Sequence, residues 1–200
     1  MPGTEDILLP FPTPIVTARH ARSTVLIGSI GAVRGTERFD EYAALLTAEQ
    51  REILLNLVAG TWVDIELALA HYQACDALGY SVDEQLANGR ATFDKTSGTL
   101  LGTVLRMAKQ AGVTPWSILP QFQRFWHRGY DGGGVRVTRI APKEARVELV
   151  QFRLCESRYY KNALRGLVTA IVERFCRRAY LVEEPSARAS SAATFRVQWA

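Results

Sequence analysis

The chain has 200 residues, of which 48% are hydrophobic and 22% charged, with a formal net charge of +4. These values are typical of one compact globular domain and argue against disordered, collagen-like and fibrous chains. A membrane span is not expected, because the most apolar stretch, Leu100–Leu105, is soon followed by Arg106 and Lys109. The N-terminus is acidic and broken by prolines where a secretory signal is basic and then apolar, so we expect a cytoplasmic protein.

The three cysteines, Cys75, Cys155 and Cys176, are odd in number, far apart and without a CxxC spacing. This pattern favours reduced, mostly buried thiols over a disulfide framework.

Four of the eight prolines lie within residues 1–20, and proline favours extended backbone. The sequence therefore predicts a flexible Pro-rich arm over residues 1–22 and a single domain over 23–200. Residues 24–30 (TVLIGSI) are short and β-branched, and predict a strand. Thr47 and Gln50 have the spacing of a capping box, which predicts a helix over about 47–58.

Two further helices are expected in the first half of the chain. One runs from Trp62 to Leu78 and ends at Gly79 as a C-cap. The other begins at Ser81 and continues to about residue 112. It holds Gly89, Gly98 and Gly102, each of which costs about 1 kcal/mol relative to Ala inside a helix. We expect the compensation to be close approach of a neighbouring backbone. Trp62 and Phe93 should then be buried between helices.

A fourth helix is predicted over about 115–128, after which the hydrophobic period changes. Residues 129–134 (GYDGGG) indicate a turn, and the next two alternating segments, ending near residue 154, predict a β-hairpin. A helix near 158–176 and two strands follow, and Trp199 should pack where the last strand meets the helices. The order gives an α+β fold: an N-terminal layer of about four helices followed by a ββαββ antiparallel sheet unit.

Several ordered features also carry a family resemblance over about residues 24–199. They are Trp62 at the predicted helix start, Gly-Arg-Ala at 89–91, the aromatic-basic run 125–130 and the final strand closing on Trp199. In these features the chain resembles a large paralogous family of uncharacterised myxobacterial proteins. That family in turn distantly resembles vinyl-reductase-type sensory domains, TRAPP vesicle-tethering subunits and domains that accompany nitric-oxide sensors.

The resemblance implies an α+β fold and the binding of a small molecule, a lipid or a protein, and it transfers no catalytic residue. The sensory relatives often hold zinc with cysteines near the last hairpin. Residues 182–195 contain no Cys, so the resemblance gives no support for a metal there.

One helix face also presents metal-binding residue types, since Asp64, His71 and Cys75 are seven and then four residues apart. A structural zinc site normally needs four ligands, and no second His/Cys pair has a suitable spacing. We therefore expect an ordinary half-buried helix face without a metal, and no cofactor.

His127 lies in an aromatic-basic run with Tyr130, which suits ligand stacking or proton transfer. A histidine near a helix C-terminus more often stabilises the helix dipole. The GYDGGG segment lacks the Lys-Ser/Thr ending of a phosphate loop. No nucleophile, base and orienting group can be assembled from the sequence.

The largest local excess of positive charge lies between residues 153 and 178, a segment with seven basic residues and only two acidic ones, Glu156 and Glu173. Arg158, Lys161 and Arg165 share one helix face and could border a groove for an acidic partner or a phosphate. The alternative is a solvated helix face. No nucleic-acid-binding motif is present, so nucleic acid is not an expected partner.

We therefore expect a non-enzymatic binding or regulatory module that recognises a small apolar or anionic ligand or a protein partner. Its expected contact residues are Arg158, Lys161, Arg165, His127 and Tyr130. Two alternatives stay open at this point. One is an enzyme that acts on a small molecule with His127 as acid-base group, and the other is a structural subunit that forms a homodimer through its helices.

Overall fold

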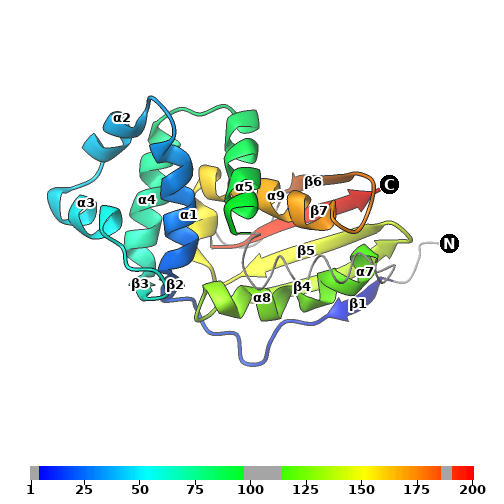
Figure 1. The fold of residues 1–200 in the computed structure, drawn as a ribbon. Helices are drawn as coiled ribbons and strands as arrows, with labels where there is room; N and C mark the ends of the chain where they lie inside the picture. The colour runs from blue at the N-terminus through cyan, green and yellow to red at the C-terminus, as the bar shows by residue number, and fades with distance from the viewer. Residues whose placement is uncertain (1–4, 97–113, 186–190) are drawn as a thin grey trace.

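The computed structural model describes residues 5–96, 114–185 and 191–200. Figure 1 shows helices α1 to α4 grouped on one side of the molecule and a large sheet on the other, with α5 and α9 between them. No helix in the described ranges is long and apolar enough to cross a membrane.

The large sheet is antiparallel, with strand order β1-β4-β5-β7-β6. Its strands are β1 (Asp6–Leu9), β4 (Gly134–Ala141), β5 (Glu144–Val150), β6 (Ala179–Glu184) and β7 (Ala193–Trp199). Helix α9 (Arg158–Val172) connects the hairpin β4–β5 to the hairpin β6–β7. The predicted α+β class and the ββαββ unit are therefore confirmed.

The helices before the hairpin are α1 (Ser23–Arg34), α2 (Phe39–Ala44), α3 (Ala48–Leu55), α4 (Ile65–Ala77), α5 (Val82–Thr96), α7 (Pro115–Ile118) and α8 (Phe122–Gly129). Short 3-10 turns cover Leu119–Gln121 and Arg153–Glu156. The predicted capping box is present at the start of α3, where Thr47 Oγ1 accepts from the Gln50 amide and Gln50 Oε1 accepts from the Thr47 amide. Ser81 and Glu84 make the corresponding contacts before α5.

The strand predicted over residues 24–30 is wrong, because this segment lies inside helix α1. The buried residues of α1 recur at helical spacing over twelve positions, namely Ser23, Leu26, Ser29, Ile30 and Val33. Burial of this stripe outweighs the β propensity of the first few residues, and the period becomes visible only beyond the seven residues considered.

The predicted start of the second helix at Trp62 is also wrong. Trp62 belongs to β3 (Trp62–Asp64), which pairs with β2 (His20–Arg22), and α4 begins after Asp64, whose side chain accepts from the Glu66 amide. Trp62 is 42% exposed and stacks under the Arg22 guanidinium at 4.0 Å. Its predicted burial is therefore wrong. The strand that pairs with β3 lies about 40 residues earlier in the chain, so local spacing did not reveal it.

The other two aromatic predictions are confirmed. Phe93 is buried on α5, and Trp199 is buried at the end of β7 in an edge-on contact with Trp116 of α7.

Helices α5 and α9 cross with their backbones in direct contact. A Cβ on Gly89 would lie 1.9 Å from the Ala163 carbonyl oxygen, and one on Gly166 would lie 2.0 Å from that of Leu86. The expected close approach is thus confirmed at Gly89. Gly98, Gly102 and the rest of the predicted third helix lie outside the described residues.

The Pro-rich N-terminal segment contributes two strands, β1 and β2, that the sequence did not predict. It runs close to the turn before β4, where a Cβ on Gly132 would lie 2.7 Å from both the Val16 oxygen and the Ala18 nitrogen. Asp131 accepts bonds there from the backbone amides of Arg19 and His20. The boundary at residue 22 stays a prediction.

Candidate functional site

The interior between the helices and the sheet holds an unusual group of buried phenols. Six of the seven tyrosines are buried, and we call them the tyrosine cluster: Tyr42, Tyr72, Tyr80, Tyr130, Tyr159 and Tyr160. Their hydroxyls find partners inside the protein. Tyr130 pairs with Tyr160 at 3.1 Å, Tyr159 accepts from Asn88 and Tyr80 pairs with Thr36. Such pairing offsets the cost of removing each hydroxyl from water.

His71, on α4, is fully buried and lies beside the tyrosine cluster. Its Nδ1 lies 2.8 Å from the Tyr42 hydroxyl and its Nε2 lies 2.9 Å from the Ser29 hydroxyl. Burial lowers the pKa of His71 to about 3. The ring is therefore neutral at pH 7, and one nitrogen donates a hydrogen bond while the other accepts one.

The helix face that carries metal-binding residue types divides into two parts. Cys75 Sγ lies 3.9 Å from His71 Nδ1, and burial raises the pKa of this thiol, which disfavours the thiolate that binds metals. Asp64 is the exposed N-cap residue of α4 and therefore lies at the start of the helix, away from His71 and Cys75. Within the described ranges, no group of three His, Cys, Asp or Glu side chains could hold a metal ion.

His127 and Tyr130 are not brought to one site. His127 is exposed on α8 with its Nε2 2.7 Å from the Gln123 amide nitrogen, whereas Tyr130 is buried against Tyr160. These two residues therefore do not form an aromatic pocket around the His127 imidazole.

The basic face of α9 lies beside the edge strand β6. Lys161 Nζ is 2.6 Å from Glu183, and Arg165 donates from Nε and Nη2 to the Leu181 carbonyl at 3.1 and 2.9 Å. Side chains on the outward backbone groups of an edge strand block the addition of another strand. Arg158, in contrast, is exposed. The shared helix face was visible in the sequence, but its strand partners were not.

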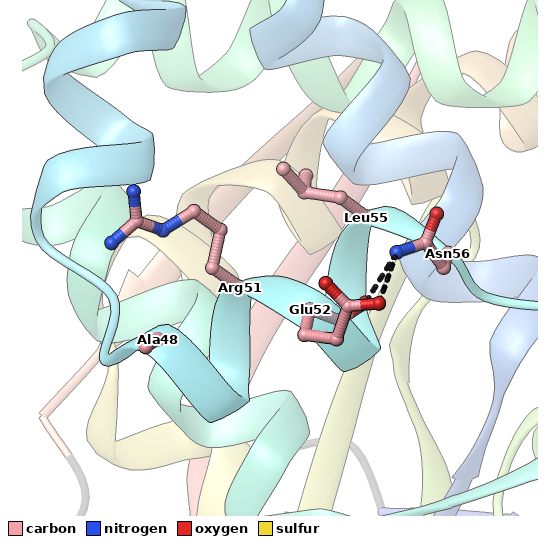
Figure 2. A pocket seen from close by; sticks show the side chains of 5 residues that line it. All are labelled: Ala48, Arg51, Glu52, Leu55 and Asn56. Atoms are coloured by element: carbon pink, nitrogen blue, oxygen red, sulfur yellow. Dashed lines mark hydrogen bonds between the residues drawn. The ribbon is translucent and has the colours of Figure 1, made fainter.

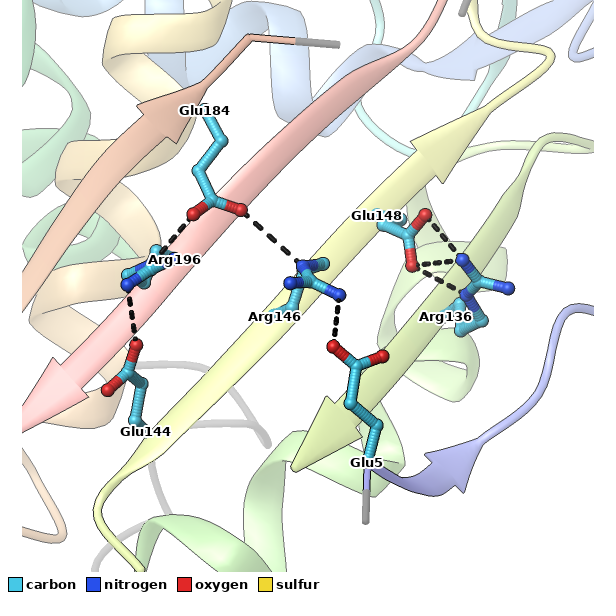
Figure 3. A network of polar contacts seen from close by, with 7 residues as sticks. All are labelled: Glu5, Arg136, Glu144, Arg146, Glu148, Glu184 and Arg196. Atoms are coloured by element: carbon cyan, nitrogen blue, oxygen red, sulfur yellow. Dashed lines mark hydrogen bonds and ion pairs between the residues drawn. The ribbon is translucent and has the colours of Figure 1, made fainter. Parts of the chain in front are cut away.

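The outer face of the sheet carries a network of charged side chains, shown in Figure 3: Glu5, Arg136, Glu144, Arg146, Glu148, Glu184 and Arg196. Arg136 binds Glu148 through two nitrogens at 2.5 and 2.6 Å. Arg196 binds Glu184 at 2.6 Å, and its Nη1 lies 3.0 Å from Glu144. The charges are compensated within the network, so this face presents no field of one sign to a partner.

A surface hollow of about 380 Å³ is lined by one face of α3, at Ala48, Arg51, Glu52, Leu55 and Asn56 (Figure 2). Asn56 donates to the Glu52 side chain and backbone, so these polar groups already satisfy one another. Ligand sites are typically concave and built from polar groups that converge from several elements. A single helix face of this kind does not provide such a site.

Comparison with protein-family models and with curated proteins found no match. Solved structures do match in fold. An Fe(II) unliganded H-NOX mutant from K. algicida superposes with a TM-score of 0.65 at 14% identity, covering 90% of this chain and 96% of that one. The unmutated K. algicida H-NOX gives 0.63 at 15% identity with the same coverage, and an H-NOX mutant from T. tengcongensis gives 0.59 at 13%, covering 89% and 97%.

These identities establish a shared fold and leave the ligand of this chain unspecified. The fold is shared with these H-NOX structures, and the sensory role that the sequence resemblance implies stays a prediction. The likeness to vinyl-reductase-type domains and to TRAPP subunits stays a prediction. Two further matches concern haem distortion, one in the H-NOX family and one through its effect on haem redox potential.

Haem iron is held in proteins by His, Cys, Met or Tyr. Every His, Cys and Tyr of this sequence lies in the described ranges, so each can be tested. His71 has both ring nitrogens engaged, His20 pairs with Asp131 at 2.6 Å, and His127 is exposed on the surface. Buried aromatic rings with centroids 4.5 to 5.6 Å apart fill the interior around the tyrosine cluster. The described residues therefore do not fit a haem.

Proposed function

We propose that this chain is a non-enzymatic regulatory module that uses the sensory-type fold without haem and recognises an acidic protein partner through its surface. The observation that carries the proposal is the filled interior. In the described part of the chain, the interior is occupied by the tyrosine cluster, Phe152 and Trp126, which are packed ring against ring. This packing favours recognition at the surface over a small apolar ligand held among these rings.

The placement of the titratable groups argues against the enzyme alternative. Catalytic acids, bases and nucleophiles combine a shifted pKa with access to a cleft. The groups with the largest shifts, including His71 and Cys75, are sealed in the core. His127, the only acid-base candidate that the sequence offered, is exposed beside Gln123, and no second titratable group in the described ranges is hydrogen-bonded to it.

On the surface, we place the partner contact at the start of α9. Lys161 and Arg165 contact the edge strand β6, whereas Arg158, at the first position of α9, is exposed. The excess of basic residues between positions 153 and 178 supports an acidic partner.

The test compares two charge reversals of exposed arginines, Arg158→Glu on α9 and Arg128→Glu on α8. Both should leave folding intact, since exposed substitutions usually change stability by less than about 0.5 kcal/mol. In crosslinking capture from a native lysate, the wild type and Arg128→Glu should recover the same acidic protein, and Arg158→Glu should lose it. The wild-type yield should also fall above physiological salt, where charges are screened within about 8 Å. Equal recovery with all three proteins would refute the α9 surface.

The haem-free part of the proposal has its own test. Titration of the purified protein with ferric haem should give no saturable one-to-one complex in the Soret region. A stoichiometric complex that is lost in His71→Gln would overturn it. Light scattering on the same sample separates this module from the homodimer alternative.

A further inference from the structure

The aromatic rings of the core form one continuous series from α8 to α2. Trp126 contacts Tyr130 and Phe152 with centroids 4.6 and 4.5 Å away, and Phe152 contacts Tyr160 at 5.6 Å. Tyr160 contacts Tyr72 at 4.9 Å. The series continues from Tyr72 to His71 at 4.6 Å and from His71 to Tyr42 at 5.5 Å. Indole and phenol side chains are the most easily oxidised aromatic groups of proteins, and electrons tunnel readily over such short separations.

Oxidation of a phenol to a stable radical also requires a place for its proton, because the phenol radical cation is a strong acid. Among the residues that the structure describes, most hydroxyls of the tyrosine cluster have no basic neighbour. Tyr130 and Tyr160 pair with each other, Tyr159 accepts from the Asn88 amide group, and Tyr80 faces the Thr36 hydroxyl. Another phenol, an amide nitrogen and an alcohol are all far weaker bases than an imidazole nitrogen.

Tyr42 differs because its hydroxyl lies 2.8 Å from the Nδ1 atom of a neutral imidazole. The other ring nitrogen, Nε2, lies 2.9 Å from the Ser29 hydroxyl, which can accept the single ring proton. In that tautomer Nδ1 is the acceptor and Tyr42 is the donor. Tyr42 and His71 are both fully buried, so water does not compete for the proton.

We propose that Tyr42 is the terminal site of one-electron oxidation in this protein, with His71 as its proton acceptor and the ring series from Trp126 as the electron path. A one-electron oxidant of the inorganic radical class, such as the azide radical, takes an electron from Trp126 and becomes azide anion. An electron from Tyr42 then refills the Trp126 hole, and the Tyr42 hydroxyl proton moves to His71 Nδ1. The products are azide anion, neutral Trp126, the neutral Tyr42 phenoxyl radical and the His71 imidazolium, so charge and atoms balance.

At the start of the path, the indole nitrogen of Trp126 donates to the Gly132 carbonyl at 2.8 Å. A carbonyl is too weak a base to take the indole proton, so an oxidised Trp126 is not trapped by deprotonation and can pass the hole inward. The hole therefore moves from Trp126, which contacts only a carbonyl, toward Tyr42, which contacts an imidazole that can take its proton.

The experiment uses the full chain and azide radicals generated by pulse radiolysis, with the tyrosyl radical followed by absorption and by freeze-quench EPR. The wild type should show an indole radical that decays as a long-lived tyrosyl radical appears. Tyr42→Phe keeps the ring and removes the hydroxyl, so it should lose the long-lived signal. His71→Gln should lose it too, because an amide accepts a hydrogen bond but not the proton. Trp126→Phe should slow the appearance of the signal.

Tyr80→Phe is the matched control. Tyr80 is buried like Tyr42 but contacts the series only from the side, through Tyr159 at 5.9 Å, so its loss should leave the signal unchanged. Circular dichroism and thermal melting check that each variant folds. For the wild type itself, proton ENDOR in light and heavy water should detect one exchangeable proton that is hydrogen-bonded to the radical oxygen from His71 Nδ1, which keeps the test valid if a variant unfolds.

Two results would overturn the proposal. One is a tyrosyl signal in folded Tyr42→Phe that equals the wild type. The other is a wild-type signal that disappears only in Tyr180→Phe, which would place the radical on the exposed tyrosine of β6.

Discussion

The interior of the molecule and the outer face of the large sheet solve the same problem in different ways, since both carry many polar groups. On the buried side, in the interior, the hydroxyls of the tyrosine cluster are satisfied mostly in separate pairs, such as Tyr42 with His71 and Tyr130 with Tyr160. On the outer face, two of the three arginines of the network bridge two carboxylates each, as Arg196 does between Glu144 and Glu184 (Figure 3). Buried pairs have no substitute partner, whereas the outer network can rearrange and is open to water. Substitutions on the buried side should therefore cost more.

The sharpest contrast lies within one strand, at two neighbouring residues of β7. Trp199 is buried against Trp116, while Gln198 is exposed on the outer face. Trp199→Ala should lower the free energy of unfolding by about 3 to 5 kcal/mol, as large aromatic truncations in cores do. Gln198→Ala should change it by less than about 0.5 kcal/mol. Urea denaturation of both variants measures the difference, and similar values would mean that the end of β7 is peripheral to the core.

A smaller loss is expected where α5 crosses α9. Gly89→Ala would place a methyl group 1.9 Å from the Ala163 carbonyl oxygen, so the helices must separate, and overpacking of this kind costs about 1 to 3 kcal/mol. Gly35→Ala is the control, because its new methyl group would be no closer than 3.6 Å to the Ala32 oxygen. Thermal melting should show a clear decrease for Gly89→Ala alone. Equal melting points would show that the crossing relaxes freely.

His71 gives the buried side a pH dependence. The unfolded histidine binds a proton near its ordinary pKa of about 6.5, whereas burial lowers the folded pKa to about 3. Protons therefore favour unfolding, and the stability present above pH 6.5 is lost as pH falls toward 3. From pH 7.5 to pH 5 the loss should reach about 2 kcal/mol. His71→Gln should remove this part of the slope in denaturant titrations, while His20 and His127 contribute equally to both proteins. Parallel slopes would contradict a neutral buried imidazole.

How far the sequence could predict this molecule depends on the range of the interactions involved. The capping box at Thr47 and the strands β4 to β7 follow from local spacing, and they are where the sequence places them. Trp62 was misassigned because its strand β3 pairs with β2, where Arg22 lies opposite it, and no local sequence pattern predicts this pairing.

The candidate site was harder to predict for the same reason. The six residues of the tyrosine cluster come from several helices, from the segment before α5 and from the turn before β4, and nothing in their spacing indicates that they meet. The spacing of Arg158, Lys161 and Arg165 correctly placed them on α9, but the strand that engages two of them begins after the helix has ended. The i, i+4 spacing of His71 and Cys75 did identify neighbours. It could not show that Tyr42 and Ser29 would occupy both nitrogens of the imidazole.

The smallest effect is expected in the outer network. Arg196 is 42% exposed and bridges Glu144 and Glu184, both of which keep contact with water to some degree. Arg196→Gln should cost only about 0.2 to 1 kcal/mol, the range of exposed ion pairs, because side-chain entropy and solvation offset most of the attraction. The cost should shrink further at high salt, since exposed charges are screened while the dry pairs of the tyrosine cluster are not. Urea titrations of the wild type and Arg196→Gln at low and high salt measure this. A loss as large as that of Trp199→Ala, unchanged by salt, would mean that the outer face is covered and that the interior and the outer face do not differ as described.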